Sequence, residues 1–266
     1  MIPIIHTGLL SVTFRKLTAE QIVELAAKAG VDGMEWGGDI HVPHGDLKRA
    51  EEVRRMTRDA GLKIAAYGSY YRAGAGEQPA GPFASVLETA QALGAPTIRV
   101  WAGNLGSAGA DAETRARVAE DARRIAELAQ QAGITISFEY HGNTLTDTAE
   151  SAVRLLREVD HPNLYTLWQP AIHLSAEENV QALRQIRHRL TNVHVFHWVN
   201  RERMPLSAGR ETWSRYLEEI AAASGDRYAM LEFVKDDDPA QFLEDAAVLK
   251  SLVAALGQSN FHTGDE

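Results

Sequence analysis

Residues 134–143 read ITISFEYHGN, and this stretch predicts a short buried strand that ends in a carboxylate. Ile134, Ile136 and Phe138 fall on one parity, while small polar residues and then Glu139 fall on the other. Successive side chains of a strand point to opposite faces, so one face suits a helix layer and the other a polar interior. Because an isolated buried charge is costly, Glu139 predicts either a function or a tight ion pair.

The pattern of a short apolar strand followed by an amphipathic helix occurs eight times in the 266 residues. Strands are expected over 3–7, 33–36, 63–67, 97–101, 134–139, 164–169, 192–196 and 227–233. Helices are expected over 18–29, 46–60, 83–93, 111–132, 146–159, 175–187, 211–223 and 239–256. Alternating units of this kind predict an α/β fold, a single-domain (β/α)8 TIM barrel over residues 1–258, with a flexible C-terminal tail over 259–266. The alternative is an open doubly wound sheet, but HTGLLSVTF is a poor phosphate-binding turn after the first strand.

Composition narrows the classes of function. The formal net charge is -9, which argues against a nucleic-acid partner because such a partner needs a basic face. The chain has no cysteine, which excludes disulfides and Cys-type zinc sites and suits the cytoplasm. Since no apolar run approaches the roughly 18 residues of a membrane span, we expect no membrane partner.

Polar residues stand at the predicted C-terminal ends of the strands, where barrels carry their active sites. They are Glu35, Trp101, Glu139, Gln169, His194 and Glu232. Two carboxylates, an imidazole and an amide oxygen together suit Mn, Mg, Co or Fe, while Zn remains possible. Glu139 and Glu232 can meet only across the barrel mouth, where one could remove a proton from a substrate and the other return one. Taken singly, each of the two is equally compatible with a structural ion pair, and a lone His194 with a core histidine.

At these same residues the chain resembles the xylose isomerase-like barrels, also described as sugar phosphate isomerases and epimerases. The matching segments are GVDGMEWGG, ISFEYHGNTLTDT, HPNLYTLWQPAIH, TNVHVFHW and YAMLEFV. Tagatose and psicose epimerases of that group bind a metal through Glu, Asp, His and Glu from strands five to eight, and use the two Glu residues as acid and base. The resemblance implies that Glu139, Gln169, His194 and Glu232 are the ligands and that Glu139 and Glu232 are catalytic. Gln169 departs from the family Asp, so the ligand set would carry a formal charge of -2 instead of -3.

Further side chains near the strand ends are candidates for substrate binding. They are Glu35, His41, Trp101, His173 and Arg201. Four of them also have a structural explanation: an ion pair with Arg99 for Glu35, loop packing for His41, packing at the barrel mouth for Trp101, and solvent exposure for Arg201. His173 lies four residues after Gln169, whereas the resembling epimerases place a substrate histidine three residues after the Asp.

These features predict a metal-dependent isomerase or epimerase that acts on a small-molecule sugar, sugar phosphate or polyol. A polyol dehydratase could use the same site, and a non-catalytic sugar-binding barrel with a decayed metal site would also explain Gln169. A two-Glu glycosidase fits less well because strand four ends RVWAGN. An abasic-site endonuclease would need a three-zinc ligand set and a basic face. The resemblance also implies a homodimer or homotetramer.

Overall fold

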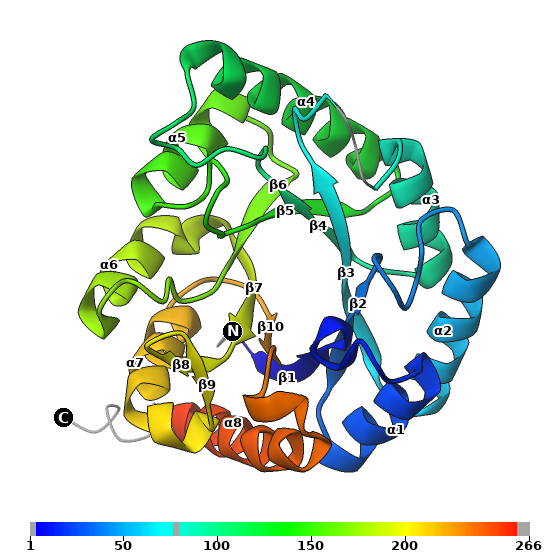
Figure 1. The fold of residues 1–266 in the computed structure, drawn as a ribbon, viewed down its shortest axis with the longest axis vertical. Coiled ribbons are helices and arrows are strands. Elements are labelled where there is room, and N and C mark those ends of the chain that lie inside the picture. Colours follow the sequence, from blue (N-terminus) through cyan, green and yellow to red (C-terminus); the bar gives the residue numbers. More distant parts are fainter. Residues whose placement is uncertain (1–3, 77–79, 260–266) are drawn as a thin grey trace.

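Eight parallel strands close into a barrel that is surrounded by helices (Figure 1). The computed structural model describes residues 4–76 and 80–259. In order around the barrel the strands are β1 (Ile5–Leu10), β10 (Arg227–Leu231), β7 (Leu190–Val195), β6 (Leu164–Trp168), β5 (Thr135–Glu139), β4 (Thr97–Trp101), β3 (Lys63–Arg72) and β2 (Gly33–Gly37). The predicted (β/α)8 TIM barrel, a single domain, is confirmed.

Eight α-helices follow the barrel strands and cover their outer faces (Figure 1). They are α1 (Ala19–Ala29), α2 (Leu47–Asp59), α3 (Phe83–Leu93), α4 (Ala112–Gln131), α5 (Ala149–Val159), α6 (Ala176–Ile186), α7 (Arg210–Ala221) and α8 (Pro239–Ser259). Local signals define their ends: Thr18 and Gln21 form a capping box that begins α1, and Gly30 ends it with a left-handed backbone at φ +64°.

The core lies between the outer face of the sheet and the inner faces of the helices. In α5 the buried residues include Ala149, Ala152, Leu155 and Val159, which is the spacing of one helix face. Ile136 and Phe138 of β5 are fully buried and belong to the same hydrophobic cluster as this helix face. The apolar parity of β5 therefore faces outward to the helices, which leaves Glu139 for the interior of the barrel.

Two predicted strands need correction, and one hairpin was not predicted. The first strand begins at Ile5 and runs to Leu10, because Gly8 and Leu9 pair with both β2 and β10. The third strand continues to Arg72, and its register against β4 shifts after Gly68. An antiparallel hairpin, β8 (His197–Val199) and β9 (Glu202–Met204), follows β7 and was not expected from the sequence.

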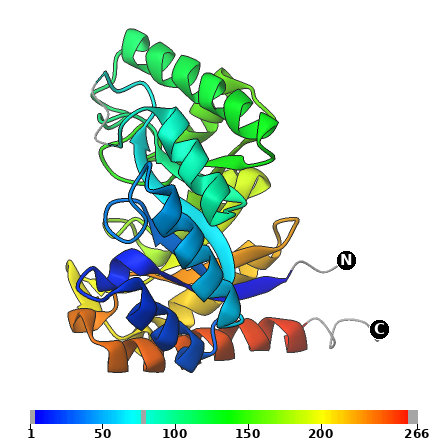
Figure 2. The same cartoon turned by 90° about the vertical axis from the view of Figure 1, so that its right-hand side faces the viewer.

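The two ends of the barrel differ. In Figure 2 the loops that follow the strands gather at one end, while the start of β1 and the last turns of α8 lie at the other. The tail predicted for 259–266 lies outside the described residues, apart from Ser259, which ends α8. Among the helices that the structure describes, none combines the length and apolar character needed to cross a membrane.

Candidate active site

A cavity of about 440 Å³ opens at the C-terminal ends of the strands. Aromatic side chains form much of its wall: Tyr70, Trp101, Tyr140, Phe196, Trp198 and Phe233. Its polar lining consists of Arg15, Arg99, Glu139, His141, Asp147, Gln169, His173 and Glu232. An apolar cavity with a few convergent polar groups is the usual form of a small-molecule site.

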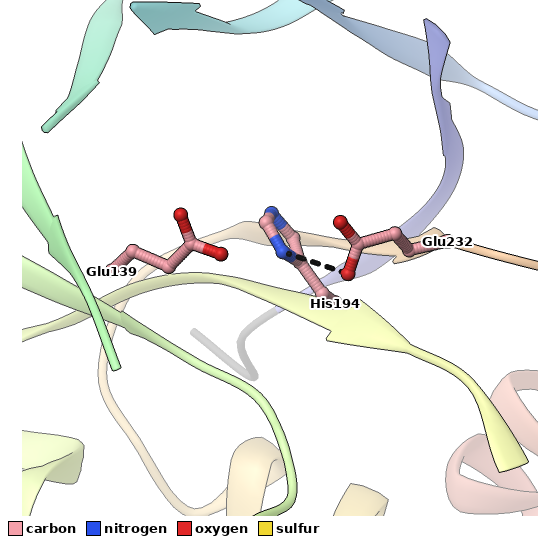
Figure 3. Close-up of side chains that lie close together, drawn as sticks. All are labelled: Glu139, His194 and Glu232. Carbon is pink, nitrogen blue, oxygen red and sulfur yellow. Dashed lines mark ion pairs between the residues drawn. The ribbon is translucent and has the colours of Figure 1, made fainter. Parts of the chain in front are cut away.

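Three buried side chains from different parts of the barrel converge here, and two of them, Glu139 and Glu232, line the cavity. Glu139 ends β5, His194 lies within β7, and Glu232 directly follows β10. One potential ligand atom from each lies within 4.8 Å of the other two. Figure 3 shows that one imidazole nitrogen, Nδ1, lies between the two carboxylates and at 3.5 Å from Glu232 Oε2.

These donors fit a divalent cation. Ligand oxygens and nitrogens lie about 2.0–2.6 Å from such ions, so atoms on opposite sides of one ion are up to about 5 Å apart. His194 Nδ1 is buried and has no hydrogen-bond partner among the described residues. A buried nitrogen without a partner is costly, and a bound cation would remove that cost.

Glu139 is held by three neighbouring donors. Arg99 Nη1 and Trp101 Nε1 both donate to its Oε2, and Gln169 Nε2 donates to its Oε1 at 3.3 Å. Burial alone would raise the pKa of Glu139, but the Arg99 cation and, to a smaller extent, His194 and His141 bring it below its ordinary value. Glu139 is therefore a fixed anion in this structure.

Glu35 links Arg99 to His194 from the other side of the barrel. Its Oε1 accepts a hydrogen bond from Arg99 Nε at 2.7 Å, and its Oε2 lies 3.3 Å from His194 Nε2. Burial opposes the charge of Glu35, yet Arg99 and His194 lower its pKa to about 2. Burial likewise disfavours the charged form of His194, while Glu232 and Glu35 raise the pKa of His194 to about 10.

The other predicted substrate-binding residues divide into two groups. Trp101 and His173 line the cavity. His41 does not, because it is buried in the loop after β2, with its ring nitrogens 3.0 Å from Ser11 Oγ and 3.2 Å from the Leu17 carbonyl oxygen. Arg201 is exposed at the turn between β8 and β9 and is absent from the cavity wall. Glu35 forms the predicted internal ion pair with Arg99.

The structure brings two further residues to the site: Arg99, expected only as a partner of Glu35, and His141, which was not expected there. Arg99 touches both Glu35 and Glu139, and its parity on β4, opposite to Ile98 and Val100, was the available signal. His141 lines the cavity and stacks on Trp101 with ring centroids 4.7 Å apart. Its position two residues after Glu139 was the only local signal for it.

Gln169, the fourth predicted ligand, directly follows β6 beside Glu139. Its amide nitrogen faces Glu139, so in this structure Gln169 acts as a hydrogen-bond donor to a predicted ligand. Binding of a cation by Gln169 would need its carbonyl oxygen to turn toward the ion. That role remains a prediction.

Comparison with known proteins agrees with this architecture. A family model described as the xylose isomerase-like TIM barrel matches residues 23–252. The chain belongs to this family. The matched residues include Glu35, Glu139, His194 and Glu232, so the site lies within the matched region.

The chain is similar to a dehydratase and to sugar epimerases. It is 28% identical to a 3-dehydroshikimate dehydratase of Bacillus anthracis over 206 residues, 70% of each chain. The crystal structure of the probable 3-DHS dehydratase from that organism matches 92% of this chain and 99% of its own length, at 23% identity and a TM-score of 0.77. A D-psicose 3-epimerase structure covers 98% of this chain and 100% of its own, at 20% identity and a TM-score of 0.67.

Proposed function

We propose that this protein is a divalent-cation-dependent enzyme that removes a proton beside the carbonyl group of a small polyhydroxylated substrate. The observation that carries the proposal is the convergence of three buried side chains, Glu139, His194 and Glu232, two of which line the cavity. His194 Nδ1 lacks a hydrogen-bond partner among the described residues. Mn, Mg or Co suits this set of oxygen and nitrogen donors, and Zn is an alternative. The cation, when bound, would polarise the carbonyl and acidify the adjacent C–H.

The chain's own residues would divide the work. Glu139, His194 and Glu232 would hold the ion, with Gln169 as a neutral fourth ligand. Glu232 is the better base of the two carboxylates, because its only ion pair among the described residues is the 3.5 Å contact with His194. Glu139 is engaged by Arg99, Trp101 and Gln169 and would move a proton less readily.

This asymmetry favours dehydration over epimerisation. In a dehydration, Glu232 takes the proton from the carbon beside the carbonyl, and the C–O bond of the β-hydroxyl breaks. The hydroxide leaves as water with a proton from a separate acid, and the product is an α,β-unsaturated carbonyl compound. His141, stacked on Trp101 at the cavity wall, is placed to be that acid. The similarity to a 3-dehydroshikimate dehydratase supports the same choice.

A sugar isomerase or epimerase is the second candidate. Its support is the pair of carboxylates on either side of one imidazole, together with the fold shared with the D-psicose and L-ribulose 3-epimerases. This reaction requires Glu139 to release a proton to the substrate as Glu232 removes one, or the reverse.

One assay separates the candidates. Protein loaded with Mn²⁺ is incubated in heavy water with a panel of ketoses and cyclic keto-polyols, and NMR follows deuterium uptake while absorbance follows enone formation. Enone formation supports dehydration, and deuterium uptake into an epimerised or isomerised sugar supports the second candidate. If no member of the panel gives either signal, the proposed enzymatic function is contradicted. If, in addition, the wild-type protein does not bind Mn²⁺, a non-catalytic sugar-binding barrel is favoured.

A further inference from the structure

Glu35 is not among the residues that line the cavity, but it contacts Arg99, which does line it, and His194 behind it. It is 2% exposed, and its two carboxylate oxygens have different partners: Arg99 Nε at Oε1 and His194 Nε2 at Oε2. We propose that Glu35 is a positioning residue that determines which nitrogen of His194 faces the cation, and so sets the affinity of the site for metal. This inference rests on the proposed function.

Hydrogen-bond chemistry assigns the proton of His194 to the nitrogen that faces Glu35. A carboxylate can only accept hydrogen bonds, so the nitrogen of His194 that faces Glu35 must carry a proton. That nitrogen is Nε2, and Nδ1 is left with its lone pair available when a cation is bound. Nδ1 is also the nitrogen that lies between Glu139 and Glu232 in Figure 3. A carboxylate behind a metal-binding histidine commonly fixes its orientation in this way.

The position of Glu35 is itself tightly constrained. Arg99 holds one of its oxygens and, through a second nitrogen, also holds Glu139. Gly68 of β3 makes room for the pair, since a Cβ atom there would lie 2.8 Å from Glu35 Oε1. Glu35 thus connects two predicted ligands, His194 directly and Glu139 through Arg99.

The substitution Glu35→Gln tests this role with little change of volume. Arg99 offers only donors, so the carbonyl oxygen of the new amide must face Arg99 and its NH2 group must face His194 Nε2. Nε2 would then have to accept, and the proton would lie on Nδ1, where the cation should bind. We expect the affinity for Mn²⁺ and Zn²⁺ to fall about 10- to 100-fold, as for other partners of metal-binding histidines.

Metal affinity is measured by titration of the full-length protein against a fluorescent chelator. The control is Glu158→Gln, which removes a carboxylate from a second arginine pair, the partly buried Arg115 with Glu158, on α4 and α5. This control should lower the melting temperature but leave metal affinity within about twofold of wild type. A purely structural role for Glu35 would give the same result as the control.

A measurement on the wild-type protein keeps the inference testable if Glu35→Gln does not fold. In zinc-loaded protein with 15N-labelled histidine, NMR should show His194 with the proton on Nε2 and the metal on Nδ1. Metal on Nε2, or less than a tenfold loss of affinity in folded Glu35→Gln, would overturn the inference while the proposed function stands. No metal uptake by the wild-type protein would overturn both.

Discussion

The two carboxylates at the barrel mouth have the same chemistry but different surroundings. Glu139 accepts hydrogen bonds from Arg99, Trp101 and Gln169, whereas Glu232 has one ion-pair contact, at 3.5 Å, with His194 among the described residues. The difference originates in the neighbouring strands. β4, beside β5, carries Arg99 and Trp101 on its inner parity, while β1, beside β10, ends in Leu9 and Leu10. Glu139 is thus held by three donors, whereas Glu232 is held by a single ion-pair contact among the described residues.

The largest expected effect comes from removing the carboxylate of Glu232, the proposed base. Glu232→Gln should lower the rate of proton abstraction about 10³-fold, within the usual range for loss of a general base. Glu139→Gln should instead weaken metal binding, so that excess Mn²⁺ restores part of the rate. Deuterium exchange at saturating Mn²⁺ distinguishes the two variants. Equal residual rates would mean that the carboxylates share the proton transfers, as the second candidate function requires.

Arg99 is the reason for the asymmetry, and its removal should be costly. Arg99→Met leaves two buried carboxylates, Glu35 and Glu139, without their counter-ion. Loss of one partner of a buried pair typically costs about 3–5 kcal/mol of unfolding free energy. Urea denaturation of the metal-free protein measures this loss. A loss below 1 kcal/mol would show that Glu139 is not held as an anion, and the comparison with Glu232 would no longer stand.

The pH dependence of stability tests the same network. A carboxyl group whose pKa is lowered by folding stabilises the protein above its unfolded pKa and loses that contribution as the pH falls. For Glu35 the window runs from the ordinary value of 4.5 down to about 2. The unfolding free energy of the wild-type protein should therefore exceed that of Glu35→Gln by on the order of 3 kcal/mol at pH 6. This difference should shrink as the pH falls to 3. Urea denaturation at both pH values measures it, and a constant difference would contradict a charged Glu35.

Alternating strands and helices were enough to predict the barrel, because each unit repeats the same local pattern. The parity of β5 correctly placed Glu139 in the interior of the barrel. The β8–β9 hairpin was missed because each of its strands has only three residues, too few to show an alternating pattern. Short elements of this kind depend on packing more than on local sequence.

The roles of individual site residues depend on contacts that are distant in the sequence. His41 is fixed by Ser11 and Leu17, which belong to another loop and gave no sequence signal toward it. The asymmetry between Glu139 and Glu232 likewise depends on which strands are neighbours around the barrel. The sequence could place charged residues at strand ends, but only the closed structure shows which of them share donors.

The smallest expected effect concerns a single donor to Glu139. Trp101→Phe keeps an aromatic ring beside His141 but removes the indole N–H that donates to Glu139. A hydrogen bond to a charged group contributes about 2 kcal/mol, and one between neutral groups about 1 kcal/mol. The matched control is Trp213→Phe, which removes an indole hydrogen bond of 2.8 Å to the neutral carbonyl oxygen of Phe196.

If Glu139 is a fixed anion, Trp101→Phe should lower the unfolding free energy of the metal-free protein by about 1 kcal/mol more than the control does. Urea denaturation of both variants at pH 7 gives the difference directly. Equal losses would indicate that the indole donates to a neutral carboxyl group. Glu139 would then carry a proton that it can deliver to a substrate, and the epimerase would become the better of the two candidate functions.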